Sequence, residues 1–425
     1  MSVKKRYSGY FTLTSSAAIA QGFMLLISPI ITRIYGPEDI GSFGVIVGLG
    51  ALIGSVGTGR LEHAIPVARD AGEAIQIAIL GTYLALIASA LAVLFALAMP
   101  SIGIVKDAGW DHLPMMAIPS IALSLAAFQV INALLLRQRY YGSVGANKIA
   151  QGFTTGTAQI LLGWFGFGAA GLAWAQAIGY LSGGLNGIRK LSVRLSVVIR
   201  RRGLRLRKTF SNYKKFPLML APAALFNQAS QYLPVLALGY VYGLYEAGLY
   251  ALVIRVCGAP LGLLGQAVAQ VYAAEFRTYL AGGGEQLAAR YLVMLMRLLG
   301  MGVVVVGVMV AILSYAGTWL FGEKWANIGM VSLLLSPMLI MDFATTPISM
   351  TLGYLSRARV QLLWDIGRLL VIIVVFLLAG ILSLSWGKLL LMLAGAWSIS
   401  LLIHSWITYR SCYRHEASSP TVNGT

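Results

Sequence analysis

The sequence predicts an all-α polytopic membrane protein, and its composition, its apolar runs and its charge pattern lead to this fold class. Hydrophobic residues make up 58% of the 425 positions and charged residues only 11%, against about a quarter charged residues in soluble proteins. Apolar runs of 18 to 27 residues alternate with short polar breaks. Because about 20 apolar residues cross a bilayer core as a helix, and helices satisfy their own backbone groups in lipid, each run is expected to be a membrane span.

The chain is expected to contain about twelve spans. The segment MSVKKRYSGY is basic and leads into the first apolar run without an obvious small-residue cleavage site, so we interpret that run as an uncleaved first helix. Several later spans contain proline, which membrane helices tolerate and which often marks a bend. The expected spans lie near 9–33, 40–59, 74–99, 114–136, 146–166, 168–188, 216–242, 247–274, 290–316, 326–352, 360–380 and 386–409.

The 32 lysines and arginines fall unevenly on the two sides that twelve spans define. We count 25 on the side that carries both termini and 4 on the other, while Arg255, Arg297 and Arg368 lie inside helices. This asymmetry places both termini in the cytoplasm, since cytoplasmic loops are rich in Lys and Arg. Residues 189–215 alone hold 11 of these charges. A connector lying on the inner leaflet is favoured there over a nucleic-acid patch, so no nucleic acid partner is expected.

One short corner of the chain is present twice, 207 positions apart. ITRIYGPEDIGSFG, residues 31–44, returns as LGYVYGLYEAGLYA, residues 238–251. In each copy a helix ends at a Tyr-Gly turn, an acid follows where it can cap the next helix, and a further glycine opens that helix. The equivalent pairs are Gln21/Gln228, Tyr35/Tyr242, Gly36/Gly243, Asp39/Glu246 and Gly41/Gly248.

This repeat predicts two six-helix bundles related by internal duplication. Residues 1–188 form the N-terminal bundle, 189–215 a basic cytoplasmic connector, and 216–425 the C-terminal bundle with a short cytoplasmic tail. Because each half has an even number of helices, the two halves share one orientation in the membrane. Transporters are often built this way, with substrate held between halves that rock to give alternating access.

The sequence lacks the patterns of an enzyme or of a resident cofactor. We find no glycine-lysine phosphate loop, no metal-ligand spacing among the four histidines, and no evident pairing of nucleophile and base. Cys257 and Cys412 suggest neither a disulfide framework nor a metal cluster. We therefore expect a protein that is not an enzyme and has no catalytic or metal-ligating residues.

Charged side chains inside the spans are candidates for function, because each must face protein or water. Arg255, Arg297 and Arg368 could each hold an anionic group of a substrate with paired hydrogen bonds. Structural ion pairs with Asp342 or Asp365 are the alternative. Asp342 is itself a candidate for binding a coupling proton or sodium ion, or for pairing with a buried arginine.

Amide side chains in the first and seventh spans are a second set of candidates. Gln21, Gln228 and Gln231 could hydrogen-bond a polar substrate or an ion, although amides also hold membrane helices to one another. At the cytoplasmic edge, Glu62 lies beside Arg60 and His63, and we expect a surface cluster there.

Two stretches, TRIYGPEDIGSFGV and FPLMLAPAALFNQASQYLPVLALGYVYGLYEAGLYALVIRVCGAPLGLLGQAVAQVYAAEF, resemble the polysaccharide-exporting flippases of the O-antigen (Wzx) type. These belong to the multidrug/oligosaccharidyl-lipid/polysaccharide exporter superfamily, with the MATE drug exporters and the lipid II flippases. The resemblance covers essentially the whole chain. It implies a multi-pass flippase of the bacterial inner membrane with two six-helix lobes around a V-shaped cavity.

The cargo that this resemblance implies is an undecaprenyl-pyrophosphate-linked oligosaccharide, a repeat unit of O-antigen for lipopolysaccharide or of a related polysaccharide. It would pass from the cytoplasmic to the periplasmic leaflet by alternating access. A polysaccharide polymerase and chain-length proteins are the further partners expected, beside the lipid bilayer.

The resemblance also points to three arginines as contacts of the cargo head group. In the similar lipid II flippases, cavity arginines lie near the ends of helices 1 and 2 and within helix 8. The matching positions are Arg33 in TRIYG, Arg60 in GTGRLEHA and Arg255 in ALVIRVCGAP. An arginine early in helix 1 of those relatives is absent from FTLTSSAAIAQ, so the head group is expected to be held differently here.

Two other functions stay open. A cation-coupled exporter of small molecules would use the same fold, and a polysaccharide polymerase would act on the same cargo. The basic candidates favour an anionic head group over cationic drugs, and the short outside loops leave little room for polymerase chemistry.

Overall fold

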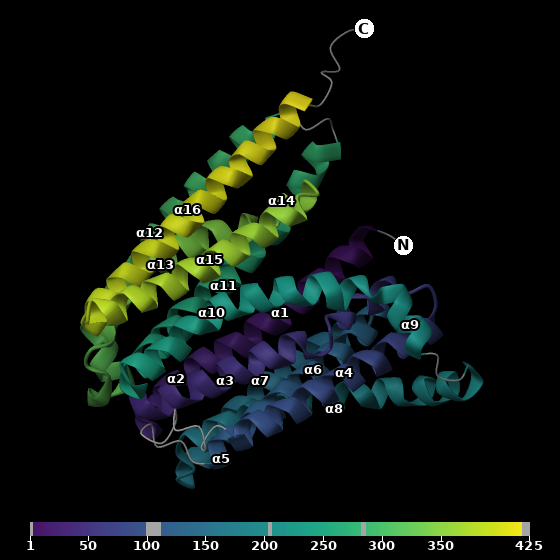
Figure 1. Cartoon of the computed structure of the whole chain (residues 1–425), viewed down its shortest axis with the longest axis horizontal. Coiled ribbons are helices and arrows are strands. Elements are labelled where there is room, and N and C mark those ends of the chain that lie inside the picture. Colours follow the sequence, from purple (N-terminus) through teal and green to yellow (C-terminus); the bar gives the residue numbers. More distant parts are fainter. Residues whose placement is uncertain (1–2, 99–111, 203–205, 282–285, 419–425) are drawn as a thin grey trace. The chain divides into compact units, whose positions relative to one another are not determined.

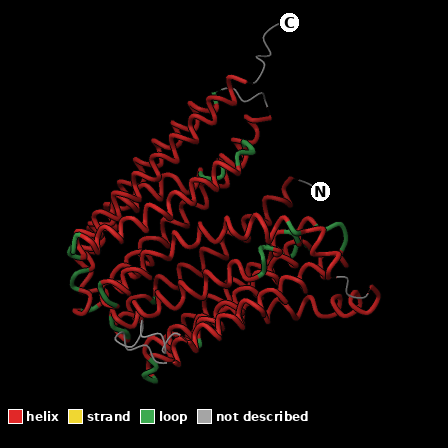
Figure 2. The backbone as a smooth tube through the Cα atoms, in the orientation of Figure 1, coloured by secondary structure: helices red, strands yellow, loops and turns green. Residues whose placement is uncertain are grey.

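A computed structural model describes residues 3–98, 112–202, 206–281 and 286–418 of the chain. In these ranges every regular element is a helix, joined to the next by a short turn or loop (Figures 1 and 2). The predicted all-α class is confirmed. Nine helical segments among the described residues are long and apolar enough to cross a membrane, which makes the chain a multi-pass membrane protein.

The chain divides into two compact units, Met1–Ala251 and Leu252–Thr425. The first unit contains α1 (Val3–Leu26), α2 (Ser28–Ile34), α3 (Pro37–Gly57), α4 (Ala71–Ala98), α5 (His112–Met115), α6 (Ala117–Arg137), α7 (Tyr141–Trp164), α8 (Gly168–Arg202), α9 (Leu206–Tyr213), the π-helical η5 (Phe216–Leu220) and α10 (Ala221–Val241). It packs α10 against α3, so the seventh expected span belongs to this unit. The division into two bundles at 189–215 stays a prediction from the duplication.

Helix α11 (Leu244–Ala281) begins in the first unit and continues into the second. The second unit then contains α12 (Leu287–Phe321), η6 (Glu323–Trp325), α13 (Ile328–Thr345), η7 (Thr346–Ile348), α14 (Thr351–Tyr354), α15 (Ala358–Ile381) and α16 (Trp386–Ser418). Within it, α13 lies between α12 and α16 and packs on both.

Each of the twelve expected spans is helical over most of its described residues, but α7, α8 and α10 are less apolar than the other nine. Polar side chains of α6, α7 and α8 contact one another in the first unit. The side-chain amides of Asn132, Asn147 and Asn186 lie 2.9 and 3.0 Å apart in a chain across three helices. Hydrogen bonds of this kind hold membrane helices together where a purely apolar surface would give no preference over lipid.

Several helix boundaries differ from the sequence expectation. The first span is broken at Ile27, next to Pro29, into α1 and α2, as the missing N–H of proline allows. Helix α8 continues to Arg202, so the first half of the basic connector is an extension of the sixth span. Helix α16 runs to Ser418, beyond the expected end near 409.

The first copy of the repeated corner is fixed by two hydrogen bonds. The hydroxyl of Tyr35 donates to the carbonyl of Gln159 on α7 at 2.7 Å, and the backbone N–H of Gly36 donates to Asp39 at 3.1 Å. Burial and the charge of Asp39 raise the pKa of Tyr35 to about 12, so this hydroxyl remains a donor. The acid therefore caps α3, as its spacing predicts.

The two copies of the corner contact each other at their equivalent glycines. A side-chain carbon added to Gly41 would overlap the carbonyl oxygen of Leu244, and one added to Gly248 would overlap the carbonyl oxygen of Pro37. Pro37 and Leu244 are themselves 207 positions apart, so the contact is reciprocal. Helices α3 and α11 thus approach backbone to backbone, which only residues without a side chain permit. A two-fold relation between the copies predicts such a contact.

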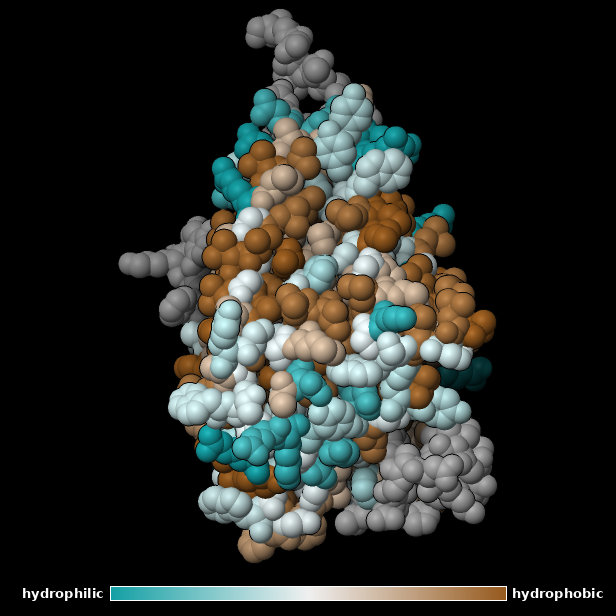
Figure 3. Space-filling model, turned by 90° about the vertical axis from the view of Figure 1, so that its left-hand side faces the viewer, coloured by the Kyte–Doolittle hydropathy of each residue, from teal (hydrophilic) through white to brown (hydrophobic). Residues whose placement is uncertain are grey.

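Apolar side chains cover much of the surface. On the face drawn in Figure 3 they form broad patches with polar residues gathered above and below. Helix α12 is an example, since Met296, Val304, Val308 and Ile312 are all exposed. Exposed apolar area on this scale fits a lipid environment.

Candidate functional site

A cluster of charged and aromatic side chains lies inside the second unit, between α13, α15 and α16. Arg368 and Asp365 on α15 are 4% and 5% exposed. One guanidinium nitrogen of Arg368 lies 3.8 Å from Asp365, as the i,i+3 spacing predicts. Asp342 on α13 accepts a hydrogen bond from the indole of Trp397 on α16 at 3.1 Å.

Aromatic rings hold the Arg368 guanidinium in place. Its central carbon lies 4.6 Å from the ring centre of Trp364 and 5.4 Å from that of Trp397. Such a cation over an aromatic face is attracted to the ring's negative centre. Trp397 therefore joins Arg368 to Asp342, because its face contacts the cation while its N–H donates to the carboxylate.

His404 on α16 extends this polar cluster. It is 2% exposed, and its Nε2 lies 3.1 Å from the side-chain oxygen of Gln361. Its ring centre lies 4.3 Å from that of Trp364, with the two ring planes tilted by 46°. Gln361 in turn donates to Asp365 at 3.5 Å. A titratable imidazole, two carboxylates and a guanidinium are thus linked through short contacts.

The cluster is incompletely satisfied. Nε and one terminal nitrogen of Arg368 are buried without a hydrogen-bond acceptor among the described residues. A buried charge with unused donors is costly, since each unsatisfied donor loses its hydration. Groups of this kind can take up a proton, an ion or an anionic ligand, and they mark functional positions in membrane proteins.

The sequence pointed to Arg368 and Asp342 but missed the residues that join them. Positions 361, 364, 365 and 368 are spaced i, i+3, i+4 and i+7, so they share one face of α15. That spacing could have revealed the polar face. The approach of Trp397 and His404 from α16 is long-range and has no such signal.

A second polar cluster follows α3 in the first unit. The guanidinium of Arg60 lies 3.6 Å from Glu62, Thr58 donates to the same carboxylate, and His63 lies 3.5 Å from it. The expectation of a surface cluster is wrong for Glu62, which is 6% exposed. Its carboxylate turns inward because Thr58 at the end of α3 provides a buried hydroxyl. Arg60 adopts a left-handed backbone conformation (φ 58°).

This environment lowers the pKa of His63, first through burial and then through the charge of Arg60, while Glu62 opposes the shift. His63 is therefore favoured in its neutral form. The Nε of Arg60 is also buried without a partner among the described residues. Arg60 is thus tied by Glu62 but retains a donor for a further acceptor.

The two predicted head-group arginines of the first unit lie at opposite ends of α3. Arg33 is exposed at the end of α2, directly before α3, and Arg60 follows the C-terminal end of α3. A helix of 21 residues is about 30 Å long. One diphosphate cannot touch both at once, so any contacts with a single head group would be successive.

The other predicted residues lie on separate helices. Arg255 is half-buried on α11, Gln228 is half-buried and Gln231 exposed on α10. The side-chain oxygen of Gln21 on α1 is buried without a hydrogen-bond donor within the described ranges.

Arg297 on α12 lies at a cavity of about 380 Å³ that also contains Arg290. In the part of the chain that the structure describes, no group of three or more His, Cys, Asp or Glu is placed to hold a metal ion.

Solved structures of membrane transporters have a similar architecture. An inward-facing multidrug resistance MATE family transporter of the MOP superfamily aligns with a TM-score of 0.62 and 16% identity over 97% of this chain and 96% of that chain. An outward-facing MATE transporter aligns with a TM-score of 0.61 and 16% identity over 96% of each chain. A MOP superfamily transporter from Pyrococcus furiosus, described as having a binding pocket of reversed polarity, gives 0.58 at 15% identity over 96% of each.

The fold is therefore that of MOP superfamily transporters, as the similar lengths and nearly complete coverage require. The chain belongs to the polysaccharide biosynthesis protein family, whose sequence model matches residues 30–330. This confirms the resemblance carried by the Tyr-Gly corner and the stretch after the basic connector. Among curated proteins no match was found.

Proposed function

We propose that this protein moves undecaprenyl-pyrophosphate-linked oligosaccharide, a repeat unit of O-antigen or of a related polysaccharide, from the cytoplasmic to the periplasmic leaflet by alternating access. The observation that carries the proposal is the pairing of a transporter fold over nearly the whole chain with membership of a polysaccharide biosynthesis family. A transporter used in polysaccharide synthesis needs an intermediate that must cross a membrane, and a lipid-linked repeat unit is such an intermediate.

The proposed site is the bacterial inner membrane, with both termini in the cytoplasm. The count of 25 positive charges on one side against 4 on the other supports this orientation. The α8 extension and α9 carry much of that charge, where they would lie against anionic lipids of the inner leaflet.

Arg255, Arg33 and Arg60 would hold the pyrophosphate. Arginine suits this role because its planar guanidinium stays charged and donates two parallel hydrogen bonds to phosphate oxygens. The length of α3 supports successive contacts, with Arg60 and Arg33 engaging the head group at different stages of its passage. Gln21, Gln228 and Gln231 would serve the sugar hydroxyls.

The cluster around Arg368 would couple transport to an ion gradient. Asp342 and His404 are groups that can gain and lose a proton, and the fixed guanidinium between Asp365 and Trp397 would respond to their charge. Sodium binding at Asp342 is the alternative form of coupling. In both forms of coupling, the proton or sodium ion that drives transport would bind within the second unit.

Export of small molecules is the second candidate, because the similar solved structures include multidrug resistance transporters. Cationic drugs would meet Arg255, Arg33 and Arg60 as repulsive charges, which weighs against that cargo. An anionic small molecule would not, so the test must follow the lipid-linked sugar itself.

The test is export in cells whose only copy carries a substitution at Arg255. Arg255→Ala should abolish surface polysaccharide while the protein remains in the membrane, and Arg255→Lys should restore export in part, because lysine keeps the charge without the paired donors. Arg359→Ala, at an exposed arginine near the start of α15, is the matched control and should export normally. Normal export by Arg255→Ala would contradict the head-group role.

A further inference from the structure

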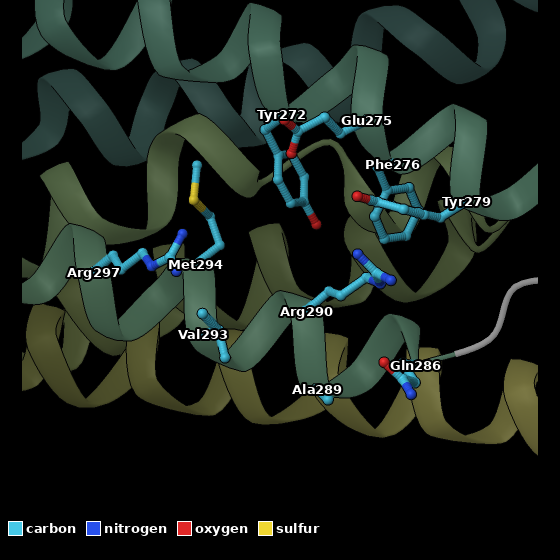
Figure 4. Close-up of a pocket in the computed structure, with 10 residues that line it drawn as sticks. All are labelled: Tyr272, Glu275, Phe276, Tyr279, Gln286, Ala289, Arg290, Val293, Met294 and Arg297. Atoms are coloured by element: carbon cyan, nitrogen blue, oxygen red, sulfur yellow. The ribbon is translucent and has the colours of Figure 1, made fainter.

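A cavity of about 380 Å³ lies between the C-terminal part of α11 and the first turns of α12. Both helices contribute side chains to it, and Figure 4 shows the guanidinium of Arg290 beside the aromatic residues of α11. All of these residues belong to the second unit. The lining is Tyr272, Glu275, Phe276, Tyr279, Gln286, Ala289, Arg290, Val293, Met294 and Arg297.

Two arginines stand two helical turns apart on this wall of α12. Arg290 is held with its guanidinium carbon 3.7 Å from the ring centre of Tyr279, so the cation is oriented before any ligand arrives. Arg297 is exposed, and neither arginine has an ion-pair partner among the described residues. Two guanidinium groups on one face, of which Arg290 is already oriented, offer several donors to phosphate oxygens.

Arg297 lies directly before the uncharged apolar part of α12. The helix has 35 residues and is therefore about 50 Å long, which exceeds a bilayer core of about 30 Å. Because the residues from Leu298 to Phe321 carry no charge, the guanidinium of Arg297 lies at the edge of the membrane-spanning stretch, where an anionic lipid head group can reach it.

Charge near the cavity also favours an anion. Glu275 is the single acidic residue of the lining, against two arginines. Arg277 lies on the neighbouring turn of α11, over the ring of Tyr354 at 4.9 Å, and Tyr354 contacts Phe276 of the lining at 5.9 Å. The surplus of positive charge raises the local concentration of anions.

An apolar stripe lies along the same face of α12 as Arg297. Val293, Met301, Val304 and Val308 are 44–66% exposed, and their spacing from Arg297 places them on the same face of the helix. A ligand that is anionic at one end and apolar over a longer length would match both parts. A free phosphate would use only the first.

We infer that this cavity is a loading site for the diphosphate head group of an isoprenoid lipid, whose chain lies along the apolar stripe of α12. The inference rests on the proposed function and deepens it by adding a phosphate-binding site to those expected at Arg255, Arg33 and Arg60. Two guanidinium groups match the two phosphate groups of a diphosphate. On the charge pattern this end of α12 faces the cytoplasm, where the cargo is made.

The test is equilibrium binding of radiolabelled geranyl diphosphate to the purified full-length protein in detergent. The variants are Arg290→Gln, Arg297→Gln and Arg297→Lys, with Arg359→Gln as the control for loss of one exposed arginine. Each glutamine substitution in the cavity should weaken binding by about tenfold or more, since hydrogen bonds to charged groups are lost. Arg297→Lys should retain part of the affinity, and Arg359→Gln should keep this binding.

Inorganic pyrophosphate and phosphatidylglycerol identify the source of the phosphate. Geranyl diphosphate should bind at least about tenfold more tightly than pyrophosphate, because its hydrocarbon is removed from water. Equal binding of pyrophosphate would overturn the lipid assignment, and equal displacement by phosphatidylglycerol would overturn the diphosphate assignment. Unchanged binding in a correctly folded Arg297→Gln protein would overturn the site itself.

The same variants separate this inference from the proposed function. If Arg297→Gln loses geranyl diphosphate binding but cells carrying it export polysaccharide normally, the cavity binds the lipid but is not its loading site. The wild-type protein could instead bind geranyl diphosphate at this cavity while cells without the protein still present lipid-linked sugar on the outer leaflet. In that case the proposed function fails and the binding site stands.

Discussion

Adding one methyl group at the crossing of α3 and α11 should destabilise the first unit. In Gly41→Ala the new carbon would lie 2.9 Å from the carbonyl carbon of Leu244, whereas carbon atoms in contact lie about 3.5–4.0 Å apart. The two backbones must therefore separate by at least roughly 0.6–1.1 Å, and by more to relieve the overlap with the carbonyl oxygen of Leu244. All three of the nearest atoms are backbone atoms, so no rotamer change relieves the overlap.

The magnitude follows from two opposing contributions. Overpacking of a close contact costs about 1–3 kcal/mol, and the better helix propensity of alanine returns up to about 1 kcal/mol. We expect a net loss of about 1–2 kcal/mol. The midpoint of thermal unfolding in detergent should fall by several degrees, at about 2–4 °C per kcal/mol.

Two further variants make this prediction specific. Gly22→Ala changes a glycine of α1 with no heavy atom within 4 Å of the added carbon, so its midpoint should be unchanged or slightly higher. Gly248→Ala should cost about as much as Gly41→Ala, because its added carbon meets the carbonyl carbon of Pro37 at 2.7 Å. The double variant should cost less than the sum, since one separation relieves both overlaps. Equal midpoints for Gly41→Ala and Gly22→Ala, or strict additivity, would refute the reciprocal contact.

Three other predictions concern polar contacts. Arg368→Met should lower the stability of the second unit by about 3–5 kcal/mol, because Asp365 is left buried without its counter-charge. Adding Asp365→Leu should recover most of the lost stability. If Arg368→Met alone melts like the wild-type protein, the pairing is contradicted. Lowering the pH from 8 to 5 should lower the thermal midpoint more in the wild-type protein than in His63→Gln. Because the pKa of His63 is lowered in the folded protein, stability that is present above the ordinary pKa of histidine is lost as the pH falls and His63 is protonated. Identical pH profiles for the two proteins would contradict this. Tyr35→Phe should cost about 1 kcal/mol by removing the hydrogen bond to the Gln159 carbonyl, and an unchanged melting curve would show that this bond contributes nothing.

The spans could be predicted from the sequence because each is a local, continuous apolar run. The sequence also paired Gly41 with Gly248, but it could not show that the two glycines touch, since an alignment of repeats carries no distance. The extension of α8 to Arg202 was not predicted, because the backbone of polar residues there can form hydrogen bonds within a helix or with water. Their sequence therefore does not indicate which of the two occurs.

The candidate sites were predicted less completely, for a physical reason. A charged residue inside an apolar run can be recognised from the sequence alone, so Arg368, Asp342 and Arg297 were predicted as candidates. Their surroundings come from other helices: Trp397 and His404 reach Arg368 from α16, and Tyr279 reaches Arg290 from α11. Burial of Glu62 likewise depends on the hydrogen bond from the Thr58 hydroxyl. The charged residues beside Glu62 in the sequence do not predict that bond.

The most direct measurement is the leaflet on which lipid-linked oligosaccharides accumulate in cells that lack this protein, judged by access to an added impermeant sugar-labelling enzyme. The account predicts that full-length units accumulate on the cytoplasmic side, shielded from the enzyme, and become labelled when the wild-type gene is restored. If single units reach the outer face normally without the protein, and only polymerisation or drug resistance is lost, the flippase assignment is contradicted.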